Sequence, residues 1–120
     1  MINDHCACLA LENREKISER NMEILKKNIH ILDEWVNQEP FLSYIKPNGG
    51  TTALVKYDYN ISSRDFCTEI LNHTGVLFAP GSTMNMEGWL RIGYANDSRI
   101  LKEGLALVSR YLSSIKPLNT

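Results

Sequence analysis

A small α+β domain is the fold class that this sequence predicts, and three observations support it. Helical and strand-like segments follow one another in the order α-β-β-α-β-β-α along 120 residues. Breakers at Pro40, at residues 47–50 and at Pro117 separate several of these segments. A chain of this length forms one domain with a modest core. We therefore expect a small antiparallel or mixed sheet with helices packed on one face.

The longest helical signal covers residues 12–38. On a helical wheel, apolar residues occupy one half and charged residues the other, as in an amphipathic helix. The apolar half comprises Ile17, Met22, Ile24, Leu25, Ile29, Ile31, Leu32, Trp35 and Val36. His30 falls on the charged half, so we interpret it as a solvated side chain. Pro40 is expected to end the helix.

A β-hairpin and a second helix are expected next. Strands over 42–45 and 51–57 flank a Pro-Asn-Gly-Gly sequence that is typical of a turn. The helix is expected to begin at Ser62, with Asp65 three residues on as in a capping box. Gly75 is expected to end it as a left-handed cap.

Two strands and a helix complete the predicted order. The strands are expected over 76–79 and 89–95, and the helix over 98–115 after the capping sequence Asn96-Asp97-Ser98. The apolar face of this helix comprises Leu101, Leu105, Val108, Leu112 and Ile115.

The last strand carries a single arginine, Arg91, among apolar neighbours. Alternation places Leu90, Ile92 and Tyr94 on one face, and Trp89, Arg91, Gly93 and Ala95 on the other. A guanidinium cannot lose its charge, and its planar donors suit a carboxylate or a phosphate. Gly93 leaves space beside it, so this face resembles the wall of a pocket. From spacing alone, an anion site and a surface salt bridge both remain open.

Composition and charge argue against several classes of protein. The 13 basic and 14 acidic residues give no positive field for nucleic acid. The sequence contains no apolar run of membrane-spanning length and no signal-peptide pattern, so we expect a cytoplasmic protein without a membrane partner. The three cysteines, an odd number, favour a reducing compartment. Cys6, Cys8 and Cys67 lack zinc-site spacing and are interpreted as plain thiols.

Four motifs occur together in this chain. The first is LENREKI at residues 11–17, which leads into a long helix that ends at residues 32–36. The second is the predicted hairpin, KPNGGTTA, at residues 46–53. The third and fourth are GVLFAPGS at residues 75–82 and LRIGYA at residues 90–95. In order and spacing they resemble the C-terminal small domain of class I/II, fold-type-I, pyridoxal-phosphate-dependent aminotransferases. The resemblance covers nearly the whole chain.

The resemblance implies a role for Arg91. The matching arginine of the family binds the α-carboxylate of an amino-acid or 2-oxo-acid substrate, and Gly93 leaves room for its approach. The Pro80-Gly81 turn is expected only to shape the chain. For Thr51 and Thr52, a place at the mouth of the site and a purely structural role both remain open.

The resemblance also implies pyridoxal 5'-phosphate in a longer parent enzyme. The Schiff-base lysine and the phosphate cup belong to the family's large domain, and no lysine here is a credible substitute. We therefore expect the isolated chain to be inactive and to bind no cofactor tightly. Residues 1–11 are expected to be the remnant of a preceding interdomain helix, and residues 12–120 the small domain. Expected partners are the large domain and, through the wide apolar helix face, a second copy in a homodimer.

Other functions remain open at this stage. A free-standing amino-acid-binding regulatory module, in which Arg91 binds a free carboxylate, would also suit a small α+β domain, as would a pure dimerisation domain. Within the family, the same domain serves transaminases, decarboxylases, lyases and cyclising enzymes. Residues 84–87 precede the arginine strand and are candidates for substrate contact, but their composition does not decide between apolar and charged substrates.

Overall fold

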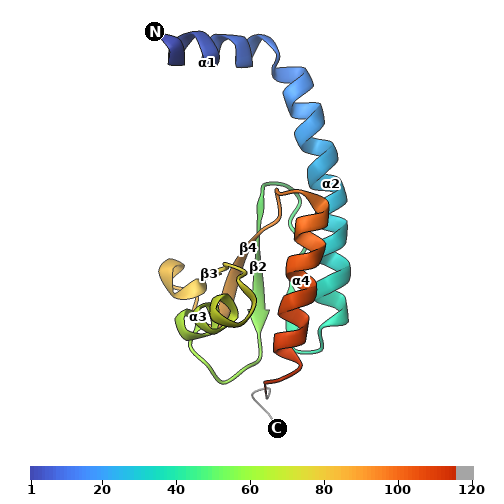
Figure 1. Cartoon of the computed structure of the whole chain (residues 1–120), viewed down its shortest axis with the longest axis vertical. Coiled ribbons are helices and arrows are strands. Elements are labelled where there is room, and N and C mark those ends of the chain that lie inside the picture. Colours follow the sequence, from blue (N-terminus) through green and yellow to red (C-terminus); the bar gives the residue numbers. More distant parts are fainter. Residues whose placement is uncertain (116–120) are drawn as a thin grey trace.

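The computed structural model describes residues 1–115 and contains a four-stranded antiparallel sheet with helices on one face (Figure 1). The elements in chain order are α1 (Ile2–Glu12), α2 (Arg14–Gln38), β1 (Leu42–Tyr44), β2 (Thr52–Tyr57), α3 (Ser63–Thr74), β3 (Ala79–Pro80), the 3-10 helix η1 (Gly81–Met84), β4 (Trp89–Gly93) and α4 (Ser98–Leu112). The strand order is β1-β2-β4-β3. The predicted α+β class and the β1–β2 hairpin are confirmed. Pro117 lies outside the described residues.

The core lies between one sheet face and helices α2, α3 and α4. Alternate residues of β2 and β4 are buried, because side chains point to opposite faces in turn. The core includes Leu32, Trp35, Val55, Phe66, Ile70, Leu90, Ile92, Tyr94, Leu105 and Val108. The other side, here called the open face, carries Ser43, Thr52, Leu54, Lys56, Ala79, Trp89, Arg91 and Gly93. The sheet therefore has one covered face and one uncovered face.

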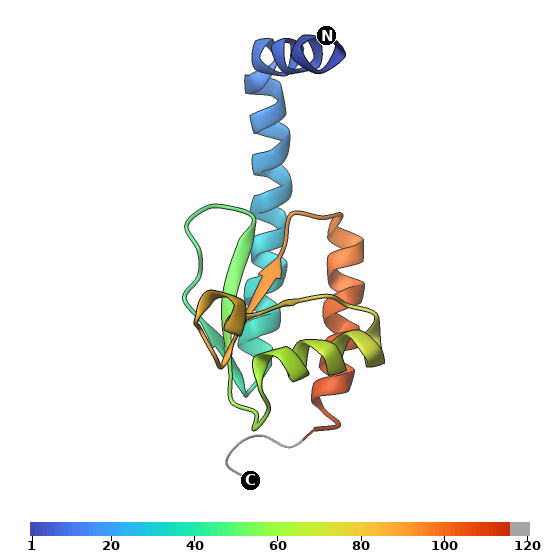
Figure 2. The ribbon, with the colours of Figure 1, turned by 90° about the vertical axis from the view of Figure 1, so that its left-hand side faces the viewer.

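The helix predicted over 12–38 extends further toward the N-terminus and is broken at Asn13. The Asn13 side-chain amide donates to the Leu9 carbonyl at 2.8 Å, a local bond that competes with regular helical bonding. The figures show α1 turning away from α2 at this point (Figure 2). No residue of α1 is buried. In the first half of α2, Ile17 and Met22 are 44% and 51% exposed, so the apolar face is covered only farther along.

Two strands are shorter than predicted. β3 contains only Ala79 and Pro80, although a strand was expected over 76–79. The Val76 N–H instead donates a hydrogen bond to the Thr74 hydroxyl at 3.1 Å. An apolar cavity of about 230 Å³ separates residues 76–78 from β4. β4 ends at Gly93, two residues early, because the chain there turns toward α2.

The predicted helix caps are confirmed. The Ser62 hydroxyl accepts a hydrogen bond from a first-turn N–H of α3 at 3.2 Å, and Gly75 ends this helix with φ of 76°. The Asp97 carboxylate caps α4 in the same way. α4 ends at Leu112 and not at residue 115, because the Ser113 and Ser114 hydroxyls donate to the last carbonyls.

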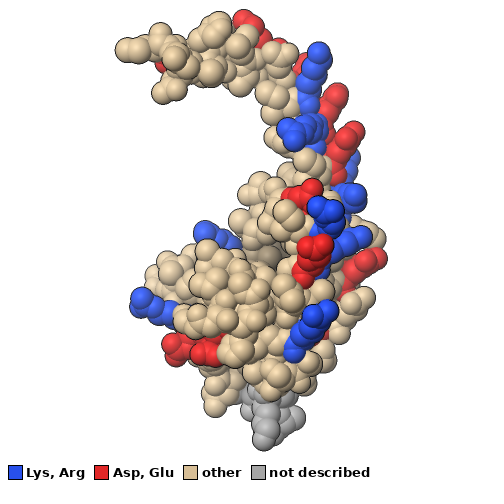
Figure 3. Space-filling model, in the orientation of Figure 1, with Lys and Arg blue, Asp and Glu red and all other residues tan. Residues whose placement is uncertain are grey.

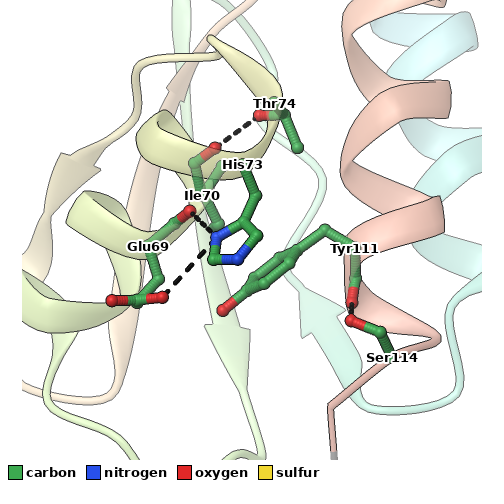
Figure 4. Close-up of polar contacts among 6 residues, drawn as sticks. All are labelled: Glu69, Ile70, His73, Thr74, Tyr111 and Ser114. Carbon is green, nitrogen blue, oxygen red and sulfur yellow. Dashed lines mark hydrogen bonds and ion pairs between the residues drawn. The ribbon is translucent and has the colours of Figure 1, made fainter.

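An aromatic contact joins α3 to α4. The His73 ring stacks on Tyr111 with 4.8 Å between ring centroids, and its Nδ1 lies 2.9 Å from the Glu69 carbonyl oxygen (Figure 4). His30 is exposed and pairs with Glu34, in agreement with its predicted solvated position. Among residues 1–115, no group of three or more His, Cys, Asp or Glu residues could hold a metal ion.

A buried asparagine joins α2 to the end of β4 and the start of α4. Asn28 is fully buried, and its side-chain amide donates to the carbonyls of Tyr94, at 2.7 Å, and Asn96. Its side-chain oxygen accepts a hydrogen bond from the Ser98 hydroxyl at 2.7 Å. Sequence analysis did not single out Asn28. The sequence feature that could have indicated its burial is its position four residues before Leu32, on the side of α2 that is buried.

We expect Asn28→Ala to lower the free energy of unfolding by about 2–4 kcal/mol, because it leaves two carbonyls in or near the core without a donor. Chemical denaturation followed by circular dichroism measures this loss. Asn37→Ala, at an exposed position of the same helix, is the matched control and should change stability by less than about 0.5 kcal/mol. Equal effects of the two substitutions would contradict the proposed importance of Asn28.

Candidate functional site

Arg91 lies at the centre of the open face. β4 runs between β2 and β3, and Arg91 is the Cα partner of Leu54 in one and of Ala79 in the other. Its side chain is exposed. Among residues 1–115, no side chain forms an ion pair with its guanidinium. The surface salt bridge that the sequence left open is therefore not formed by this part of the chain.

Two of the other candidate residues lie beside Arg91. A Cβ built on Gly93 would meet no atom within 4 Å, so the space next to the guanidinium is open. Thr52 is the Cα partner of Gly93 and shares the open face with it. Thr51 lies outside the strand, and its carbonyl accepts a hydrogen bond from the Tyr94 N–H at 2.9 Å. The fold thus brings Arg91, Gly93 and Thr52 together and gives Thr51 a backbone role.

A hollow of about 390 Å³ lies on the open face, next to residues that neighbour Arg91. It is lined by Ile45, Pro47, Thr52, Ala53, Leu54, Met86 and Trp89. Leu54 is directly opposite Arg91, and Trp89 precedes Arg91 by two residues on the same face of β4. The hollow therefore combines apolar walls with a neighbouring cation.

Glu87 anchors the loop that leads into β4. Its carboxylate accepts hydrogen bonds from the backbone N–H of Ser63 and, at 3.0 Å, from the Ser63 hydroxyl. The buried Ser63 hydroxyl also accepts a hydrogen bond from the Ser82 N–H at 3.0 Å. The bond from the Ser63 N–H is the main cause of a lowered pKa of Glu87. Glu87 therefore binds the N-terminal end of α3.

The beginning of the same loop requires glycine. A Cβ at Gly81 would lie 2.0 Å from the Met86 carbonyl oxygen, whereas the Met86 N–H donates to the Gly81 carbonyl at 2.8 Å. Asn85 and Gly88 adopt positive φ angles of 55° and 89°. These constraints agree with the shaping role expected for the Pro80-Gly81 turn, and they hold Met86 at the rim of the hollow.

The lysines that the structure describes lie at the surface. A lysine that reacts with a carbonyl needs burial or a neighbouring cation to lower its pKa. Every lysine from Lys16 to Lys102 is exposed, and Lys46 lies 3.9 Å from the Asp33 carboxylate. Lys56 is on the open face, opposite Trp89, and is exposed as well. No buried lysine is therefore present among residues 1–115.

The charge distribution, the cysteines and the helix composition of the described residues do not indicate another binding or catalytic site. Charged side chains of both signs follow α2, so no field of one sign forms along this helix (Figure 3). Burial raises the pKa of the Cys67 thiol to about 11, which makes it unreactive, while Cys6 and Cys8 are exposed. None of the helices formed by residues 1–115 is long and apolar enough to cross a membrane.

The fold is that of pyridoxal-phosphate-dependent aminotransferases. Such an enzyme from Streptococcus suis matches 99% of this chain with a TM-score of 0.93 and 37% sequence identity. The pyridoxal-phosphate-dependent cyclase OrfR matches 88% of the chain with a TM-score of 0.81 and 21% identity, which shows the fold alone. Nicotianamine aminotransferase A from Hordeum vulgare is 26% identical over 117 residues, or 92% of this chain. No family model matches the chain.

These comparisons confirm the resemblance to aminotransferases in both sequence and fold. The chain covers 32% of the Streptococcus suis enzyme and 25% of the barley enzyme. It therefore corresponds to only a part of each of these relatives.

The lowered pKa of Glu87 predicts a loss of stability in acid. Since the pKa is lower in the folded than in the unfolded state, the ionised carboxylate stabilises the fold. This contribution is complete above the unfolded-state value of about 4.3 and disappears as the pH falls through the folded-state pKa. We expect Glu87→Gln to lose less stability than the unsubstituted chain between pH 6 and pH 3, measured by urea denaturation.

Glu103→Gln is the matched control, because Glu103 is exposed on α4 and makes no side-chain hydrogen bond or ion pair with residues 1–115. It should retain the acid sensitivity of the unsubstituted chain. The same acid sensitivity in Glu87→Gln would show that the Glu87–Ser63 contact does not contribute.

Proposed function

We propose that residues 12–120 are the C-terminal small domain of a pyridoxal-phosphate-dependent aminotransferase, and that residues 1–11 belong to the preceding interdomain helix. The observation that carries this proposal is the placement of Arg91, exposed at the centre of an uncovered sheet face and without an ion-pair partner among residues 1–115. The match of 99% of the chain to the Streptococcus suis aminotransferase supports it. A large domain of the same polypeptide supplies the lysine and phosphate contacts in this proposal.

Arg91 binds the α-carboxylate of an amino-acid or 2-oxo-acid substrate. Two parallel hydrogen bonds from the guanidinium to the carboxylate oxygens fix both the position and the orientation of the substrate. The open space at Gly93 admits the carboxylate. Pyridoxal phosphate, when bound to the complete enzyme, supplies the electron sink for the amino-group chemistry. This chain contributes by holding the substrate in a reactive geometry.

The uncovered face also supports closure against another domain. Trp89 and Leu54 are only partly buried, and Ile45 is 87% exposed. Covering these side chains removes apolar surface from water, and excluding water strengthens the charge-assisted bonds of Arg91. The enzyme is proposed to be a cytoplasmic homodimer.

A free-standing amino-acid sensor has less support. A small-molecule site usually encloses most of its ligand within a concave pocket. Arg91 instead lies on an exposed strand position, and the described residues provide no cover over the open face. The placement of Arg91 therefore favours a site completed by a second domain.

The carboxylate role predicts the effect of Arg91→Lys in the intact enzyme. A lysine retains the charge but cannot make the second parallel hydrogen bond. The substitution should therefore reduce transition-state stabilisation by about 1–3 kcal/mol, which lowers kcat/KM for the amino acid roughly 5- to 150-fold. Steady-state kinetics measure this loss. Arg99→Lys, at an exposed position of α4, is the control and should leave kcat/KM unchanged. Unchanged kinetics in Arg91→Lys would rule out the carboxylate clamp.

Gly93→Val separates substrate binding from folding. Apart from the two flanking residues, the new Cβ meets no atom of residues 1–115 within 4 Å, so the melting temperature should change little. The same side chain occupies the space beside Arg91, and KM for the amino acid should rise at least tenfold. A variant with a normal melting temperature and a normal KM would exclude substrate approach over Gly93.

A further inference from the structure

Leu54, the Cα partner of Arg91, lines the hollow on the open face, and we infer that this hollow receives an apolar side chain of the substrate. Its substrates are then amino acids with aliphatic or aromatic side chains, and the corresponding 2-oxo acids. This inference rests on the proposed function, because it requires the substrate carboxylate to bind Arg91.

The strand register places the hollow within reach of a substrate held by Arg91. Directly opposed residues of antiparallel strands have Cα atoms about 4.5–5.5 Å apart, and Leu54 is opposed to Arg91 in this way. Trp89 is about 7 Å from Arg91 along the strand and on the same face. A carboxylate on the guanidinium therefore brings the other substituents of its α-carbon close to two residues that line the hollow.

The chemistry of the walls selects apolar groups. The hollow is lined by Ile45, Pro47, Thr52, Ala53, Leu54, Met86 and Trp89, and its lining side chains carry two polar groups, the Thr52 hydroxyl and the Trp89 indole N–H, and no charge. An acidic or basic side chain would lose water there without a charged group among the lining residues, which is costly. Lys56 shares the open face but does not line the hollow. An aliphatic or aromatic side chain instead buries its surface against Leu54, Met86 and the Trp89 indole.

Contacts within this chain hold the rim of the hollow in place. Met86 follows Asn85, whose positive φ is fixed by the loop, and its N–H is bonded to the Gly81 carbonyl. The next residue, Glu87, is held by Ser63 at the end of α3. A preformed wall reduces the ordering cost of binding, so side-chain selection needs no rearrangement of this loop.

The test uses the intact enzyme and single-turnover reactions with one amino acid at a time, followed by the absorbance of the cofactor. We expect leucine and phenylalanine to react at least tenfold more efficiently than glutamate, in the range of discrimination that apolar pockets provide. Met86→Arg adds a cation to the rim and should reduce the preference for leucine over glutamate at least tenfold. Met84→Arg is the matched control, since Met84 is in the same loop but does not line the hollow.

Met86→Ala is a second test of the inference, and this substitution adds no charge to the protein. The enlarged hollow should raise the efficiency of phenylalanine relative to leucine. Preference of the unsubstituted enzyme for glutamate would overturn the inference. Equal effects of Met86→Arg and Met84→Arg on the preference for leucine over glutamate would also overturn it. That result is expected if another segment of the protein covers the hollow. Both results leave transamination intact, whereas failure to react with any amino acid would overturn the proposed function as well.

Discussion

The side-chain amide of Asn28 fixes the point at which the chain leaves the sheet. It satisfies the carbonyls of Tyr94 and Asn96, and a carbonyl buried without a donor would be costly. Tyr94 therefore remains in the covered face. Because side chains alternate along a strand, Arg91 is then directed to the open face, and a shift by one residue would bury it. A polar contact in the core thus helps to fix the face of the sheet on which Arg91 lies.

The central strand serves the core and the proposed site at the same time. Leu90 and Ile92 are almost completely buried, while Trp89, Arg91 and Gly93 between and beside them form the floor of the open face. Such a strand is paired on both sides, so its side chains are held more firmly than those of a loop. The loop before it is fixed at Gly81 and Glu87. Rigid placement of a carboxylate-binding group is the condition for orienting a substrate.

Local patterns in the sequence predicted the parts of this arrangement that depend on local physics. The alternation around Arg91 and the caps at Ser62 and Gly75 involve neighbouring residues only, and the structure bears them out. Asn28 was missed because its partners lie 66 and 68 residues away. The hollow was missed for a related reason. The hollow lies between the β1–β2 hairpin, the loop before β4 and the start of β4, and the register that brings these segments together is a tertiary property.

The size and cofactor content of the native protein test the proposed function most directly. An antibody to this domain would isolate the polypeptide from source cells, and borohydride reduction followed by peptide mapping would locate any bound pyridoxal phosphate. The proposed function predicts a polypeptide several-fold larger than 13.7 kDa, with the cofactor on a lysine outside residues 1–120. A native polypeptide of 13.7 kDa without the cofactor, or the cofactor on a lysine of this domain, would contradict it.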